Sequence, residues 1–159
     1  AALETSLPVW VGLSCCDSKF DNSVIGRNFR AEKEKSLIYD ENMHKDQPKY
    51  LPEDKIILLE DIIKSLTSLG GDVYGIMHTW FQDSIGGLKI LKNNWKGPIM
   101  FYPEIHKFDT NTHKAIITMT EEEFSNSILE LIDDQIQIVG GCCGVNDKHL
   151  KRLIQSISE

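Results

Sequence analysis

Short apolar runs alternate with longer amphipathic stretches along this chain. Four apolar runs rich in β-branched or aromatic side chains predict buried strands, at residues 7–13, 72–77, 98–102 and 136–139. Four stretches with apolar residues at helical spacing predict helices, at residues 53–69, 84–93, 121–133 and 147–157. Strand and helix therefore follow each other four times.

The ends of these helices carry recognisable capping residues. Gly70 and Gly71 favour a helix end before them, because glycine adopts the backbone angles of a C-cap. Thr120 with Glu123 matches a capping box, and Asn146 is a suitable N-cap for the last helix. The polar stretch 18–52 predicts only a weak helix at 30–39, and residues 103–118 read as a loop.

The predicted order of elements indicates an α/β fold. Apolar strands separated by helices form a parallel sheet with right-handed crossovers. Two architectures satisfy the pattern: an open four-stranded sheet covered by helices, and half of a (β/α)8 barrel. Both place functional groups at the carboxyl ends of the strands.

Chemically versatile side chains follow every predicted strand. They are Cys15, Cys16, Asp17, His78, Tyr102, Glu104, Cys142 and Cys143. Cys142 and Cys143 lie in the turn between the last strand and the last helix. A nearby helix N-terminus is expected to lower the thiol pKa and favour thiolate, the form that binds zinc. The alternative is that free cysteines merely pack as small apolar side chains, which is the expectation for Cys15 and Cys16.

Composition and charge narrow the function classes. The 159 residues suffice for one domain spanning 1–159, and 41% hydrophobic with 26% charged residues is typical of a globular protein. A net charge of −7 without a basic block argues against nucleic-acid or anionic-membrane partners. Neither a signal peptide nor a spanning segment is visible. The four cysteines form two adjacent pairs, which rarely close disulfides, so we expect a reducing, cytoplasmic location.

The last strand and turn carry a family resemblance. The run Ile-Val-Gly-Gly-Cys-Cys-Gly-Val at 138–145 resembles the C-terminal signature of the homocysteine S-methyltransferase family. The resemblance implies that Cys142 and Cys143 bind zinc. The family's third zinc ligand is a cysteine after a Gly-hydrophobic-Asn segment, and this chain has Gly-Ile-Met-His at 75–78. His78, a competent zinc ligand, would take that place, and the alternative is a core or helix-entry histidine that binds no metal.

Further segments are similar to the same family. Residues 97–103 match a strand that ends in Tyr-Pro-Asn, except that Glu104 replaces the Asn. Residues 120–124 match a helix start, and residues 8–11 match the strand that opens the family's second half. Because the family's catalytic domain is a complete (β/α)8 TIM barrel of about twice this length, the chain corresponds to its C-terminal half.

The resemblance implies a zinc-dependent enzyme that methylates the thiol of homocysteine. Partners would be homocysteine, a methyl donor, and either a second copy (a homo-oligomer) or a separate N-terminal half. Tyr102, Glu104, Cys15 and Asp17 are candidates to line the substrate pocket. Two alternatives remain: a non-catalytic zinc-binding or oligomerisation module, and a thiol-redox protein, which adjacent cysteines disfavour. His106 and His113 are expected in a solvated loop and His149 on a helix surface.

Overall fold

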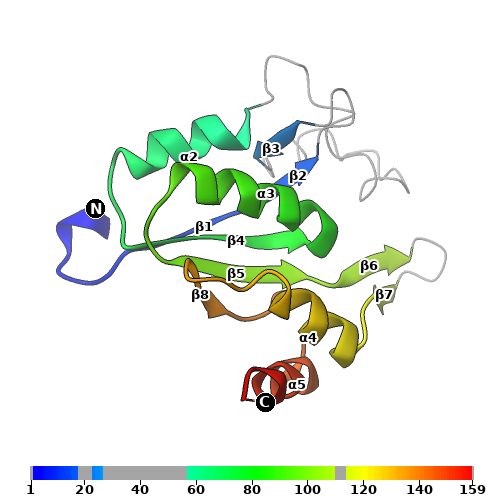
Figure 1. The fold of residues 1–159 in the computed structure, drawn as a ribbon. Coiled ribbons are helices and arrows are strands. Elements are labelled where there is room, and N and C mark those ends of the chain that lie inside the picture. The colour runs from blue at the N-terminus through cyan, green and yellow to red at the C-terminus, as the bar shows by residue number, and fades with distance from the viewer. Residues whose placement is uncertain (1, 18–22, 27–56, 110–113, 159) are drawn as a thin grey trace.

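A parallel sheet forms the centre of the molecule in the computed structural model, which describes residues 2–17, 23–26, 57–109 and 114–158. The sheet has four strands in the order β1-β4-β5-β8 (Figure 1). These are β1 (Trp10–Leu13), β4 (Val73–Trp80), β5 (Ile99–Glu104) and β8 (Ile136–Val139). All three pairings are parallel, as the apolar runs predicted.

One helix precedes β4, and one helix follows each of β4, β5 and β8 along the chain. They are α2 (Leu59–Thr67), α3 (Phe81–Asn94), α4 (Glu121–Leu129) and α5 (Asp147–Ser158), and a short 3-10 helix η1 (Ala2–Glu4) precedes β1. In Figure 1, α2 and α3 lie side by side over one face of the sheet, and α4 lies beside α5. Strands that succeed each other as βα units are neighbours in the sheet. This order is that of half a (β/α)8 barrel, whereas a doubly wound sheet reverses its order at a switch point.

The hydrophobic core lies between the sheet and the helices. Tyr74 and Ile76 of β4 and Ile99 and Phe101 of β5 are fully buried on this face. The Phe81 ring of α3 meets Phe101 edge-on, with a centroid distance of 6.0 Å. Such aromatic packing, together with the apolar area that it removes from water, anchors the helices to the strands.

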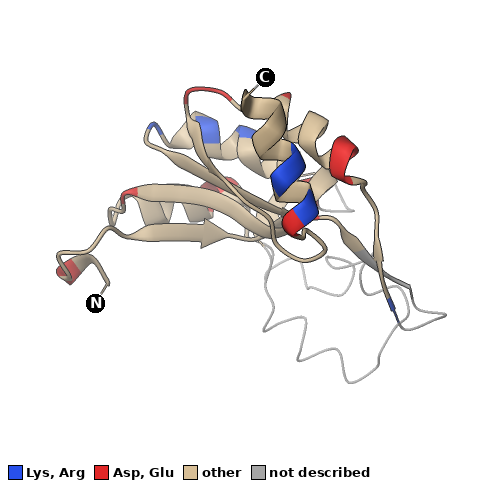
Figure 2. Ribbon diagram, turned by 90° about the horizontal axis from the view of Figure 1, so that it is seen from below, with Lys and Arg blue, Asp and Glu red and all other residues tan. Residues whose placement is uncertain are grey.

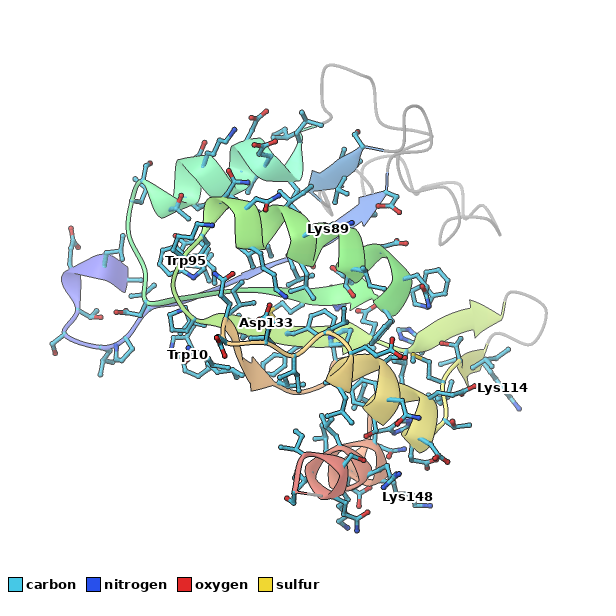
Figure 3. All side chains as sticks on the ribbon, in the orientation of Figure 1. Trp10, Lys89, Trp95, Lys114, Asp133 and Lys148 are labelled. Atoms are coloured by element: carbon cyan, nitrogen blue, oxygen red, sulfur yellow. The ribbon has the colours of Figure 1, made fainter. Side chains whose placement is uncertain are left out.

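The other face of the sheet is only partly covered. Trp10 of β1 is 52% exposed, and it lies across the sheet from Trp95, which packs against Tyr74 at 4.7 Å between centroids (Figure 3). At Gly75 on this face, an added side chain would collide with the backbone of Met100. Glycine therefore permits a close approach of β4 and β5.

Two antiparallel hairpins extend beyond the sheet. One pairs β2 (Cys15–Asp17) with β3 (Val24–Gly26), and the other pairs β6 (His106–Asp109) with β7 (Lys114–Ile117). The prediction of a loop over 103–118 is therefore wrong. Every residue of β7 is exposed, so this hairpin is built on backbone pairing and lacks the apolar alternation of a half-buried strand.

Several predicted boundaries also differ. Helix α2 begins at Leu59 because the preceding Leu58 is extended and forms an isolated bridge with Ile25. The predicted start at 53–56 and the weak helix at 30–39 lie outside the described residues. Helix α4 ends at Leu129, before the predicted residue 133. The Asp133 carboxylate instead accepts hydrogen bonds from the backbone of Gln135 and Ile136, each 3.1 Å long, at the entry to β8.

Charged residues lie mainly on helices and loops (Figure 2). Ion pairs link Lys92 of α3 to Asp133, at 2.7 Å, and Lys151 to Asp147 within α5, at 3.0 Å. Among the described helices, none combines the length and apolar character that membrane crossing requires. Glu104 is the only Asp, Glu, Lys or Arg in the four strands of the parallel sheet.

Candidate metal centre

The Cys142–Cys143 segment continues alongside β5 after β8 ends. The Gly140 amide donates to the Phe101 carbonyl at 3.1 Å, and the Cys142 amide donates to the Pro103 carbonyl at 3.0 Å. The Ile105 amide in turn donates to the Cys143 carbonyl at 3.0 Å. These bonds fix the backbone of both cysteines beside the carboxyl end of β5.

A tight turn then redirects the chain into α5. The Val145 amide donates to the Cys142 carbonyl at 3.1 Å, and Gly144, the third residue of this turn, has a φ of 90°. That backbone angle favours glycine. Asn146 caps α5 as predicted, since its side-chain oxygen accepts the amide of Lys148 at 3.0 Å.

His78, near the end of β4, lies beside the turn that carries Cys142 and Cys143. Its φ of 50° makes it the only non-glycine residue with a positive φ in the described part of the chain, and the register of β4 against β5 shifts between Met77 and Trp80. The Ser14 hydroxyl pins this irregular backbone by contacting the carbonyls of Met77, at 3.0 Å, and His78, at 3.1 Å. A bulge and a left-handed residue together redirect a side chain, and they are frequent at functional sites.

Four potential metal ligands converge at the ends of β4, β5 and β8. One ligand atom from each of His78, Glu104, Cys142 and Cys143 lies within 4.8 Å of the others. The Cys142 sulfur lies 3.6 Å from His78 Nδ1, 4.0 Å from Glu104 Oε1 and 3.9 Å from the Cys143 sulfur. His78 Nδ1 and Glu104 Oε1 are 2.5 Å apart.

Two of these separations suit a tetrahedral zinc ion. Usual zinc bond lengths place two bound sulfurs about 3.8 Å apart and a sulfur and a nitrogen about 3.6 Å apart. The distance between the two cysteine sulfurs and that from Cys142 to His78 are close to these values. The contact between His78 and Glu104 is shorter than the roughly 3.3 Å between a nitrogen and an oxygen on one zinc ion, so these two groups contact each other directly. The sulfur–sulfur distance and the distance from Cys142 to His78 therefore fit zinc, whereas the distance from His78 to Glu104 does not.

The pKa of the Cys143 thiol differs from the prediction. Burial, the neighbouring Cys142 and the Glu104 carboxyl group raise the pKa of the Cys143 thiol to about 11. The expected lowering by a helix N-terminus is wrong for Cys143, because α5 begins only at Asp147 and the nearer groups are acidic. A bound divalent cation reverses this balance, since it favours thiolate.

The first cysteine pair lies elsewhere. Cys15 is 2% exposed, and its sulfur packs under α3 near Gly87. Burial raises the pKa of the Cys15 thiol to about 12. Asp17 also lies beside α3, near Gly86. The structure therefore does not bring Cys15 and Asp17 to the four converging groups, although all of them follow strands.

The Tyr102 ring packs on Gly140, just before the two cysteines, whereas the remaining histidines do not join the four converging groups. Its ring lies so close to Gly140 that a larger residue there would collide with it. The prediction that His149 lies on a surface is wrong: it is 2% exposed and meets Phe124 edge-on at 5.7 Å. His106 begins β6 and is partly buried, with no hydrogen-bond partner at Nδ1, so it is not a solvated loop residue. His113 lies outside the described residues.

Sequence reasoning placed Glu104 in the substrate pocket and not among the metal ligands. The residue is 7% exposed, and its carboxylate faces His78 and Cys142. A signal was available, because it is the single charged residue of the sheet strands and follows an apolar run. Buried carboxylates need a partner, so such a residue at a strand end deserves consideration as a ligand.

The segment that carries this site matches a known protein family. The family model described as homocysteine S-methyltransferase matches residues 58–157. The chain belongs to the homocysteine S-methyltransferase family. No curated protein matches the chain. The matched segment contains His78, Glu104, Cys142 and Cys143, so the four converging groups all lie in the part of the chain that is assigned to the family.

Proposed function

We propose that this chain is a zinc-dependent S-methyltransferase domain that transfers a methyl group to the thiol of homocysteine, with zinc held by His78, Cys142 and Cys143. Family membership supports the reaction class. The observation that carries the proposal is the convergence of these side chains from β4 and the turn after β8. A zinc ion bound there supplies Lewis-acid stabilisation of a substrate thiolate at neutral pH.

The surrounding residues determine how a thiol can approach. The His78 side chain is 43% exposed and Cys143 is exposed, whereas Glu104 is buried. The accessible side of the group is therefore the one that His78 and Cys143 border, and a thiol reaches the ligand atoms from there. Tyr102, packed on Gly140, supplies an aromatic wall for the apolar part of a small substrate.

We further propose that the domain works with a second copy of itself or with a separate N-terminal half. The sheet has two edges, β1 and β8, that are not paired with another strand of the described residues. Its partly covered face includes the exposed Trp10. Open edges and exposed apolar faces are commonly covered by a partner. Size-exclusion chromatography with light scattering tests this part, and a monodisperse monomer would contradict the self-association.

The activity is tested by supplying the zinc-loaded protein with homocysteine and, separately, S-methylmethionine, S-adenosylmethionine, betaine or a methylfolate. Methionine formation is followed by mass spectrometry. We expect product with one donor and none with the Cys142→Ser variant. Cys16→Ser is a matched control, because Cys16 belongs to the pair outside the four converging groups. Equal turnover by the Cys142→Ser protein would contradict a role for the site.

A non-catalytic zinc-binding module is the second candidate. The observation that favours it is that the chain offers four protein donors. Structural zinc sites commonly use four protein ligands, whereas catalytic sites keep one position for water or substrate. If the zinc-loaded protein binds no thiol and unfolds when zinc is removed, this candidate replaces the enzyme.

A further inference from the structure

We propose that His149 is a positioning residue of the metal centre. Its buried imidazole closes a ring of hydrogen bonds that fixes the turn carrying Cys142 and Cys143. This inference rests on the proposed function, since it takes these two cysteines as metal ligands. It concerns a residue to which neither the resemblance nor the four converging groups assign a role.

The imidazole of His149 joins two segments that are distant in the sequence. Its Nε2 lies 3.3 Å from the Met119 carbonyl oxygen, which can only accept, so Nε2 is the donor of this hydrogen bond. Its Nδ1 lies 3.3 Å from the Asn146 amide nitrogen and 2.9 Å from Asn146 Oδ1. Because Asn146 offers both a donor and an acceptor, Nδ1 bonds to this residue with or without a proton. His149 therefore ties the segment before α4 to the start of α5.

From Met119, one arm of the ring runs to Cys143. The neighbouring Thr118 donates to the Ile105 carbonyl through both its amide and its hydroxyl, each at 2.8 Å. Ile105 is fully buried, and its amide donates to the Cys143 carbonyl at 3.0 Å. Thr118 and Ile105 therefore connect Met119 to the backbone of the second cysteine.

From Asn146, the other arm of the ring runs to Cys142. Asn146 directly follows Val145, whose amide donates to the Cys142 carbonyl at 3.1 Å. Gly144, within this turn, packs so closely on the chain after β5 that an added Cβ would lie 3.1 Å from Ile105 Cγ1. A shift of the turn therefore moves Asn146 as well, and the bond between Asn146 and the imidazole opposes that movement.

The imidazole lies beside a hollow in the packing of these two segments. Met119 and Asn146 line this hollow of about 400 Å³ together with His149. The imidazole itself is 2% exposed and meets the Phe124 ring edge-on at 5.7 Å. A buried polar group with satisfied hydrogen bonds fixes the geometry of its partners. Because metal ligands must be held within about 0.5 Å of the productive geometry, loss of this bridge should appear at the cysteine sulfurs.

Cobalt(II) is a suitable probe, because its d–d bands report the ligand geometry and its sulfur-to-cobalt absorption reports bound thiolate. The full chain is loaded with one equivalent of cobalt under reducing conditions, and cobalt affinity is measured by competition with a chromophoric chelator. His149→Leu keeps an apolar side chain against Phe124 and removes both hydrogen bonds of the imidazole. We expect this variant to lower cobalt affinity roughly tenfold, the lower end of the range for loss of an outer-shell partner, and to change the d–d bands.

Two conservative variants separate the arms of the ring. The side-chain amide of His149→Gln is long enough to donate to the Met119 carbonyl, so this variant should recover most of the wild-type affinity. The shorter His149→Asn reaches only Asn146 and should recover less. Leu153→Ala, one turn later in α5, is the matched control, because Leu153 is 3% exposed and contributes packing without a bond of the ring. It should unfold at a lower denaturant concentration yet keep the cobalt affinity and spectrum of the wild type.

Circular dichroism of the metal-free proteins establishes that each variant is folded. Wild-type cobalt affinity and spectrum in the folded His149→Leu protein would overturn the proposal and leave the cysteine-based site intact. An equal loss of affinity in Leu153→Ala would also overturn it, because lower stability alone would then explain the effect. If His149→Leu fails to fold, comparison of His149→Asn with the wild type decides in the same way. Absence of any sulfur-to-cobalt absorption in the wild type would instead overturn the proposed function together with this inference.

Discussion

The two Cys-Cys dipeptides of this chain have the same sequence and follow strands of the same sheet, yet they lie in opposite environments. Cys15 and Cys16 are 2% and 8% exposed, and Cys15 packs beneath α3. Cys142 and Cys143 are more accessible and face an imidazole and a carboxylate. A pair of thiols is therefore packing material in one place and a candidate metal site in the other. The difference comes from neighbouring strands, not from the dipeptide.

Loss of a ligand sulfur should cause the largest difference between the two cysteine pairs, measured as zinc affinity. We expect Cys142→Ser to lower zinc affinity by more than the roughly 100-fold that removing an outer-shell partner causes, because it removes a ligand itself. Cys16→Ser should leave zinc affinity unchanged. Competition with a chromophoric chelator measures both values. Equal affinities for the two variants would remove the distinction between the pairs.

Tight packing around Cys15 should make alanine substitutions at two adjacent glycines of α3 differ in their effect on stability. A Cβ atom at Gly87 would lie 2.5 Å from the Cys15 sulfur, whereas one at Gly86 would lie 3.0 Å from its nearest neighbour, a methyl group of Val24. We expect Gly87→Ala to lower the free energy of unfolding by about 1–3 kcal/mol, as overpacking usually does. Gly86→Ala is the matched control: it gains the same helix preference of about 0.5–1 kcal/mol and should cost less, because its nearest neighbour is 3.0 Å away and not 2.5 Å.

Chemical denaturation of the metal-free proteins measures this difference. Adding Cys15→Ala to Gly87→Ala should recover part of the lost stability, because it removes the sulfur that the new methyl group would meet. If the two glycine variants are equally stable, Cys15 is not packed as tightly as described.

The smallest expected effect is a dependence of stability on alkaline pH. The pKa of the Cys15 thiol is raised from 9.0 to about 12 in the folded protein, so the unfolded chain loses this proton first. The contribution is fully present below pH 9 and is lost as pH rises toward about 12. The slope is at most about 1.4 kcal/mol per pH unit.

Comparison with Cys15→Ala isolates this contribution, because other groups also titrate in that range. The free energy of unfolding of the wild type should fall more steeply above pH 9 than that of the variant. Parallel curves, measured by urea denaturation at several pH values, would show that Cys15 is not a buried thiol.

Sequence reasoning predicted the sheet and its chemistry better than its periphery. The apolar runs gave all four parallel strands, and Thr120 and Asn146 marked two helix starts correctly, because these signals are local. The hairpin at 106–117 was missed because its second strand is exposed and carries no alternation. The burial of His149 depends on contact with Phe124 of α4, which no periodicity within α5 reveals.

The candidate site could be predicted only in part for a related reason. Cys142, Cys143 and His78 were recognised because a motif and the strand order bring them together. The convergence of Glu104 with them depends on the bulge in β4 and on the positive φ of His78, which aim the imidazole at β5. Cys15 and Asp17 were grouped with the pocket because they follow a strand. The hairpin of β2 with β3 instead places Cys15 beneath α3 and leaves Asp17 exposed beside it.

The central claim is that one divalent ion binds at Cys142 and Cys143 and not at the first pair. X-ray absorption at the zinc edge of the wild-type protein, loaded with one equivalent of zinc, tests it most directly. We predict two sulfurs at about 2.3 Å and two nitrogen or oxygen ligands at about 2.0–2.2 Å. The same loading of a Cys142→Ser, Cys143→Ser protein should give no zinc–sulfur signal. A spectrum without sulfur in the wild type, or one that persists in that double variant, would contradict the account.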